Sequence, residues 1–193
     1  MEAFLRSTDV IDWQHPSVVA QAQVLRGGMT DAVAIARRCF EWVRDEIRHS
    51  SDYRLSPVTC AASEVLHEGS GFCYAKSHLL AALLRANGVP AGLCYQRLSL
   101  DDEGSRFCLH GLNAIFLPSI GWYRVDARGN RTGVDAQFTP PTERLAFPIR
   151  LPGEADLPAI RPDPLPMVVE TIRAYADAAV LGENLPDQKL ATA

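Results

Sequence analysis

At 193 residues the chain is long enough to bury the core of one globular domain, and its 47% hydrophobic and 22% charged residues are ordinary for a soluble fold. A formal net charge of −4 gives no electrostatic support for binding nucleic acid or an anionic membrane surface. Five scattered cysteines, an odd number, argue against a disulfide framework. The N-terminal residues lack the basic start and apolar run of a signal peptide, so we expect a cytoplasmic protein.

The first third of the chain is predicted to be helical. Residues 18–25 suggest a short amphipathic helix that ends at the glycine pair 27–28. Thr30 or Asp31 can then cap a longer helix, in which apolar side chains recur at steps of three and four through Ile47. A polar connector and another short helix, closing at Gly69, are expected to follow.

The stretch from residue 69 to residue 90, GSGFCYAKSHLLAALLRANGVP, places Cys73 at the start of a further helix. This helix is apolar around most of its circumference, which predicts that it is buried. A thiol at a helix N-terminus lies near unpaired N–H groups and the positive end of the helix dipole, and both favour the nucleophilic thiolate. The alternative is that Cys73 is simply a small core residue, as free cysteines often are.

After Val89 the pattern changes from helical to alternating. Strands are predicted near residues 92–98, 107–117 and 122–127, joined by turns. Several of their residues are apolar on both faces, which suits a sheet that the Cys73 helix covers on one side. Helices followed by an antiparallel sheet predict an α+β fold, in which the buried helix packs against that sheet.

A proline-rich segment begins at residue 140. Its prolines exclude regular structure, whereas its apolar side chains need covering, so we predict an extended arm packed over the domain. A final helix from about residue 167 to residue 181 and a frayed tail follow. Residues 140–193 are therefore expected to pack on the domain that residues 1–139 form.

A nucleophilic cysteine needs a base to take its proton and a third group to orient that base. His110 lies on a predicted strand, and the next strand ends in Asp126. The two side chains meet only if the hairpin register puts them on one face of the sheet. Otherwise His110 is a core histidine and Asp126 a turn residue. His15, His49 and His67 lie on lead-in or connecting segments, where solvated or capping roles are the default.

Three blocks of this sequence resemble the transglutaminase-like superfamily, whose fold is papain-like. The stretch around Cys73 is similar to the family's cysteine motif. The residues HGLN at 110–113 and GWYRVD at 121–126 are similar to its histidine and aspartate strands. The blocks occur in the family's order, and the resemblance covers roughly residues 30–135.

The resemblance implies that residues 1–139 are a catalytic domain, with Cys73 as nucleophile, His110 as general base and acid, and Asp126 fixing the imidazole. Cys73 would form a thioester with an amide or ester substrate, which a peptide, a protein or a small molecule could supply. Hydrolysis of the thioester is favoured over its transfer to an amine. The reaction is expected to need no cofactor or metal. The backbone N–H of Cys73 should contribute to an oxyanion hole, with Tyr53 as a weak candidate for the side-chain donor.

Two other functions compete with this interpretation. Some proteins of this fold keep the shape and lose the chemistry, so the domain could be a binding module for peptide or protein. A metal site built from Cys94, Cys108 and His110 is the second alternative, but the sequence has no Cys-x-x-Cys partner for it.

Overall fold

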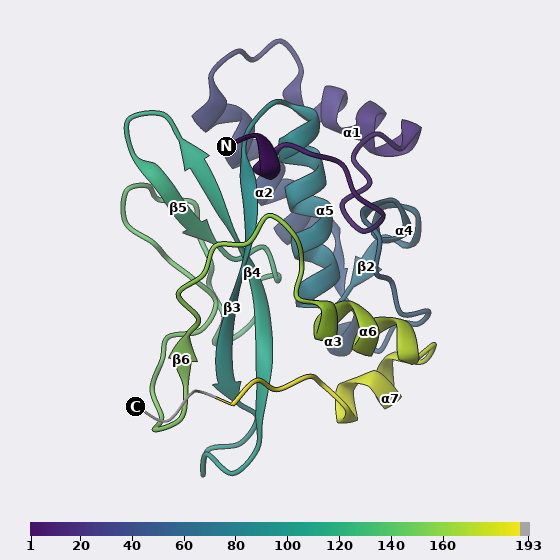
Figure 1. Ribbon diagram of the computed structural model, residues 1–193, viewed down its shortest axis with the longest axis vertical. Coiled ribbons are helices and arrows are strands. Elements are labelled where there is room, and N and C mark those ends of the chain that lie inside the picture. The colour runs from purple at the N-terminus through teal and green to yellow at the C-terminus, as the bar shows by residue number, and fades with distance from the viewer. Residues whose placement is uncertain (190–193) are drawn as a thin grey trace.

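A buried helix packed against a curled antiparallel sheet forms the centre of the protein (Figure 1). The computed structural model describes residues 1–189. Helix α5 (Cys73–Ala86) is buried at every position from Cys73 to Arg85, as its apolar circumference predicts. The main sheet has the order β5-β4-β3-β6 and consists of β3 (Ala91–Ser99), β4 (Phe107–Leu117), β5 (Gly121–Val125) and β6 (Ala155–Asp156). The α+β prediction is confirmed.

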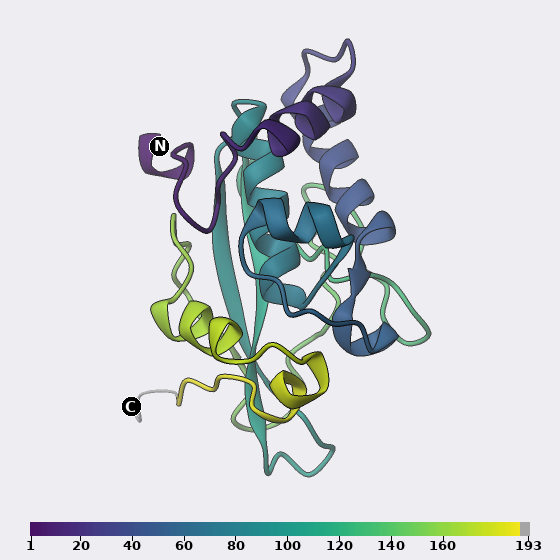
Figure 2. The ribbon, with the colours of Figure 1, turned by 90° about the vertical axis from the view of Figure 1, so that its right-hand side faces the viewer.

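Helices from the first third of the chain cover the side of α5 that faces away from the sheet (Figure 2). They are α1 (Pro16–Arg26), α2 (Ala32–Glu46) and α4 (Ala62–Glu68), preceded by the short 3-10 helix η1 (Glu2–Phe4). Between α2 and α5, strand β1 (Arg48–His49) pairs in parallel with β2 (Ser70–Gly71), and α3 (Ser50–Tyr53) follows β1 directly. This two-residue pairing fixes the chain immediately before Cys73.

The arm from residue 140 to residue 165 crosses the other face of the sheet (Figure 1). Its Leu157 N–H donates to the carbonyl of Tyr95 at 2.9 Å, and β6 pairs with β3. Apolar side chains of the arm, Leu145 and Ile160, pack against Leu112 and its neighbours on the sheet. The arm therefore encloses that face of the sheet and contributes a short strand to it.

The prediction of one continuous final helix is wrong, because this region contains two helices. Helix α6 (Pro166–Ala174) ends before Tyr175, whose backbone is extended, and α7 (Ala178–Glu183) starts afresh. The Asp177 carboxylate caps α7 by accepting the N–H groups of Ala179 and Val180 at 2.9 and 3.1 Å. This cap begins α7 as a separate helix. The predicted frayed tail falls partly on residues 190–193, which lie outside the described residues.

Arg85, in the last turn of α5, ties three distant segments together. Its buried guanidinium donates to the carbonyls of Arg6 at 2.8 Å, Ala91 at 2.8 Å and Pro162 at 2.5 Å. One guanidinium therefore donates hydrogen bonds to the N-terminal segment, to the start of β3 and to the arm.

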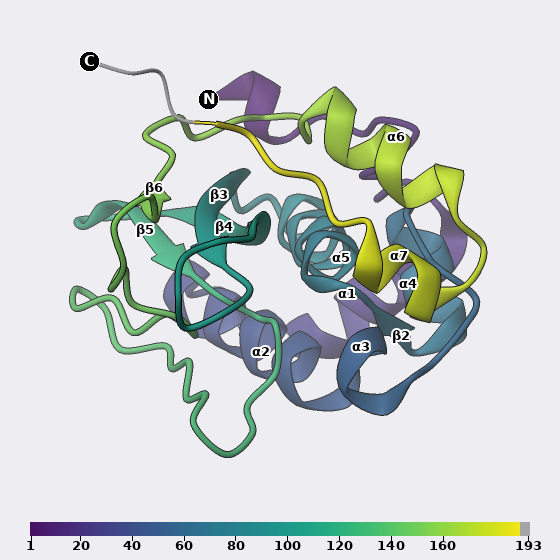
Figure 3. The ribbon, with the colours of Figure 1, turned by 90° about the horizontal axis from the view of Figure 1, so that it is seen from below.

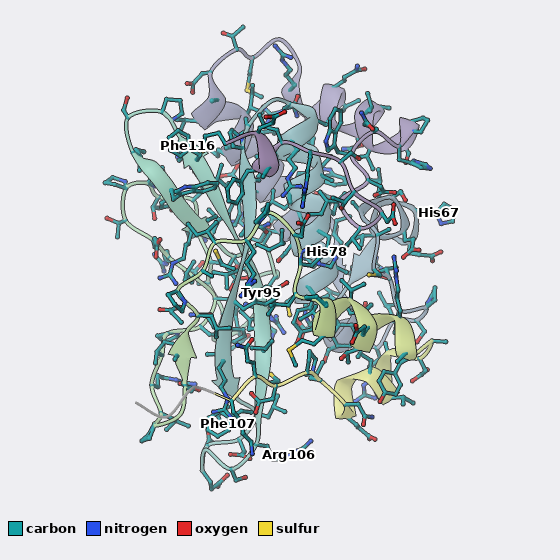
Figure 4. All side chains as sticks on the ribbon, viewed as in Figure 1. His67, His78, Tyr95, Arg106, Phe107 and Phe116 are labelled. Atoms are coloured by element: carbon teal, nitrogen blue, oxygen red, sulfur yellow. The ribbon has the colours of Figure 1, made fainter. Side chains whose placement is uncertain are left out.

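We expect Arg85→Leu to lower the free energy of unfolding by about 2–4 kcal/mol, because it leaves buried carbonyls without a donor. Urea unfolding followed by circular dichroism measures the change. Arg106→Leu is the matched control, since Arg106 is exposed at the β3–β4 turn (Figure 4). Equal stability of the two variants would contradict the role assigned to Arg85.

Candidate active site

The hairpin formed by β4 and β5 brings His110 and Asp126 together. In its register Asn113 is opposite Val125, so the next residue, Asp126, falls opposite Leu112 and on the sheet face that His110 occupies. His110 Nε2 lies 2.7 Å from Asp126 Oδ2. Both side chains are buried, at 5% and 0% exposure.

Asp126 is held from three directions. Besides His110, its carboxylate accepts the N–H of Ala146 from the arm and the N–H of Arg128, each at 3.2 Å. Burial alone would raise the pKa of Asp126, but the charge of His110 and these hydrogen bonds lower it overall. Asp126 is therefore a fixed carboxylate that orients the imidazole ring.

Cys73 is the first residue of α5, and Phe72 before it is extended and provides no side-chain cap. Within residues 1–189 the N–H of Cys73 has no backbone acceptor, as expected at a helix start. The N–H of Gly111 on β4 points to Cys73 Sγ at 3.5 Å. Cys73 also lies close enough to His110 to raise the pKa of its imidazole. Because Nε2 of His110 is hydrogen-bonded to Asp126, Nδ1 is the ring nitrogen that remains free to exchange a proton with the Cys73 sulfur.

The neighbours of His110 decide its charge. Burial alone would lower the pKa of the imidazole, but Asp126 and Cys73 outweigh burial and raise it to about 10. The ring therefore keeps its proton at neutral pH and lies between two groups that can carry negative charge. Phe147 stacks edge-on against it, with ring centroids 5.1 Å apart, and shields it from water.

A cavity of about 320 Å³ opens beside Cys73 and His110. Its walls are mainly apolar and include Leu98, Leu100, Phe147 and Leu185. The last two come from the arm and from the segment after α7, which crosses the sheet near β3 and β4 (Figure 3). The cavity can therefore hold an apolar group next to the thiol.

Tyr53, the side-chain donor that the sequence suggests, does not line this cavity. Its side chain is 61% exposed, and its ring lies 5.6 Å from the guanidinium of Arg48. The residue that does line the cavity is His49, which sequence reasoning left as a connecting residue. The available signal was alternation, because Ile47 and His49 are buried while Arg48 between them is exposed.

Cys94 and Cys108, the other members of the metal alternative, are buried thiols. Burial raises the pKa of each to about 12. Within the part of the chain that the structure describes, no group of three or more His, Cys, Asp or Glu side chains is arranged to hold a metal ion. None of the described helices is long and apolar enough to cross a membrane.

The buried cysteine helix and its antiparallel sheet define a transglutaminase-like, papain-like fold. The family model of the transglutaminase-like superfamily matches residues 19–127, more than half of the chain, and the protein belongs to this superfamily. The resemblance seen in the three sequence blocks is thus confirmed. Among curated proteins no match was found.

Two solved structures are similar to part of this chain. A candidate cysteine protease from Cytophaga hutchinsonii superposes with a TM-score of 0.53 at 18% identity, over 65% of this chain and 40% of its own. The periplasmic domain of TgpA from Pseudomonas aeruginosa gives a TM-score of 0.46 at 24% identity, over 58% of this chain and 42% of its own. The protein thus spans less than half the length of these two structures.

We expect iodoacetamide to modify Cys73 before the other cysteines at mildly acidic pH, measured by mass spectrometry across a pH series. Burial raises the pKa of Cys60 to about 11 and of Cys108 to about 12, whereas Cys73 lies beside a protonated His110. Cys108 is the internal control, because it lines the same cavity and is also 8% exposed.

In the same experiment His110→Ala should abolish the modification of Cys73 at acidic pH, because the cation is lost. Asp126→Asn should weaken it less, because the imidazole remains but is poorly held. Earlier labelling of another cysteine, or an unchanged Cys73 profile in His110→Ala, would show that the three residues do not act together.

We expect Gly111→Ala to slow the alkylation of Cys73 by separating α5 from β4. A Cβ at this position would lie 3.0 Å from the Tyr74 ring and 3.1 Å from Tyr74 Cα, which belongs to the first turn of the helix. Gly28→Ala is the matched control, since nothing lies within 4 Å of its Cβ. Alkylation at the wild-type rate in Gly111→Ala would show that this close contact is dispensable.

Proposed function

We propose that the protein is a thiol-dependent hydrolase that cleaves an amide or ester bond through a thioester at Cys73. The observation that carries the proposal is that Cys73 lies beside His110 at the edge of the cavity, while His110 is hydrogen-bonded to Asp126. A nucleophile, a proton carrier and an orienting carboxylate are the three parts that nucleophilic acyl transfer requires.

In the first half-reaction the Cys73 sulfur attacks the carbonyl carbon of the substrate. An S–C bond forms, and the C=O π electrons move to oxygen, which becomes an oxyanion near the free N–H of Cys73. When the intermediate collapses, the bond to the amine or alcohol breaks. The leaving group takes the proton from His110 Nδ1, and Cys73 is left as a thioester with His110 neutral.

In the second half-reaction water attacks the thioester carbon and gives a proton to His110. The S–C bond breaks, the carboxylic acid leaves, and Cys73 and His110 return to their starting state. Asp126 keeps the ring oriented in both halves, because Nε2 stays bonded to it while Nδ1 exchanges the proton.

Hydrolysis is favoured over amine transfer by the surroundings of the cavity. The cavity shares Ser99, Leu100, Arg150 and Glu154 with a polar groove, which is also lined by the exposed Asp102. Water can reach the thioester through this groove, whereas a transferase must exclude water and hold the amine. The apolar walls support a peptide, protein or small acyl substrate with an apolar group beside the scissile bond. Five free cysteines support action in a reducing, cytoplasmic compartment.

The test is turnover of activated acyl donors, such as p-nitrophenyl esters and acyl-aminocoumarin amides, with and without a primary amine. We expect repeated release of the chromophore and a free acid product, abolished by Cys73→Ala and retained by Cys108→Ala. An amide as the main product at modest amine concentration would overturn the preference for hydrolysis. Lack of turnover with every donor would favour the binding-module alternative.

A further inference from the structure

His49 is a buried group in the cavity to which the proposed reaction assigns no role. It is 8% exposed and lines the same cavity as Cys73 and His110. Its position is fixed by the parallel pairing of β1 with β2, where His49 is opposite Gly71. Gly71 precedes Cys73 by two residues, so the backbone itself sets the imidazole of His49 beside the start of α5.

The surroundings of His49 keep its ring neutral. Burial is the largest cause that lowers its pKa well below the ordinary value, and the charge of Arg128 is the next. Lys76 and His110 act in the same direction, while Asp52 opposes them. A neutral imidazole has one N–H donor and adds no second positive charge beside Cys73.

The two ring nitrogens of His49 lie in different surroundings. Nδ1 is buried and has no hydrogen-bond partner among residues 1–189. The nearest carboxylate oxygen, Asp52 Oδ1, is 4.0 Å away and receives a hydrogen bond of 2.9 Å from Arg128. Nε2 has no protein partner in the same range either, and it is not among the fully buried atoms. His49 lines both this cavity and a second pocket that contains Asp52. Because Nδ1 is the nitrogen on the Asp52 side, Nε2 is the one placed to reach the cavity beside Cys73.

An oxyanion needs more than one donor, and the start of α5 supplies only backbone N–H groups from one side. We propose that His49 completes the oxyanion hole, donating its Nε2 proton to the substrate oxygen as that oxygen becomes negative. This role rests on the proposed function. It also explains why this buried histidine has no hydrogen-bond partner among residues 1–189, since its hydrogen bond forms only with the reacting substrate.

The experiment compares two reactions of Cys73 in the same variants. Acylation by p-nitrophenyl butyrate passes through an oxyanion, whereas alkylation by iodoacetamide occurs at a saturated carbon and does not. We expect His49→Phe to slow acylation by about 100-fold, the usual effect of losing one oxyanion donor, and to leave the alkylation rate within about twofold. His49→Gln keeps an N–H donor and should recover part of the acylation rate.

His67→Phe is the matched control, because the side chain of His67 is 84% exposed at the molecular surface (Figure 4). Equal slowing of acylation and alkylation in His49→Phe would show a merely structural role and overturn the proposal. Acylation of His49→Phe at the wild-type rate would overturn it as well. If p-nitrophenyl butyrate never acylates wild-type Cys73, the proposed function itself fails, and mass spectrometry of the intact protein distinguishes that outcome.

Discussion

The contact between the first turn of α5 and strand β4 is the constraint on which the site depends. Tyr74 donates its hydroxyl to the carbonyl of Leu109, and its backbone lies against Gly111, where a side chain would collide with it. This close approach aims the N–H of Gly111 at the sulfur of Cys73 and sets His110 beside it. A helix start and a strand centre are brought together because one of the two residues in contact has no side chain.

Two polar networks start from residues just after β5, and each involves a neighbour of a histidine that lines the cavity. Asp126 fixes His110 and also binds Ala146 of the arm, so the orientation of the imidazole depends on the packing of the arm. Arg128, two residues later, forms a bidentate pair with Asp52 at 2.7 and 2.9 Å. Both oxygens of the Asp52 carboxylate, which lies beside His49, therefore accept hydrogen bonds from Arg128. The same short segment therefore acts on both histidines: the Asp126 carboxylate raises the pKa of His110, whereas the charge of Arg128 adds to burial in lowering the pKa of His49.

Much of this architecture follows from the sequence, because it depends on local patterns. The apolar circumference after Cys73 predicts the buried helix, and the change to alternation after Val89 predicts the sheet. The pairing of His110 with Asp126 depends on hairpin register, which periodicity alone does not determine. Alternation around residue 48 could have indicated that His49 is buried, but not that it lies beside Cys73, since that position comes from a two-residue parallel pairing with a segment about twenty residues away. The break between α6 and α7 falls at an extended Tyr175 and at Asp177, which caps α7, within an otherwise helical pattern.

The residues that shape the cavity come partly from outside the region shared with the superfamily, which ends at residue 127. Phe147 belongs to the arm, and Leu185 to the segment after α7. That segment is anchored where the N–H of Leu109 donates to the Pro186 carbonyl at 2.7 Å and where Arg97 holds Asp187 at 2.7 and 2.8 Å. Arg97 itself stacks on Phe107, 3.8 Å from the ring centroid. The shared core thus contains Cys73, His110 and Asp126, while the later part of the chain contributes part of the cavity wall beside them. If the proposed function holds, substrate preference therefore depends on residues 128–189 as well as on the core, and similarity in the core alone does not define it.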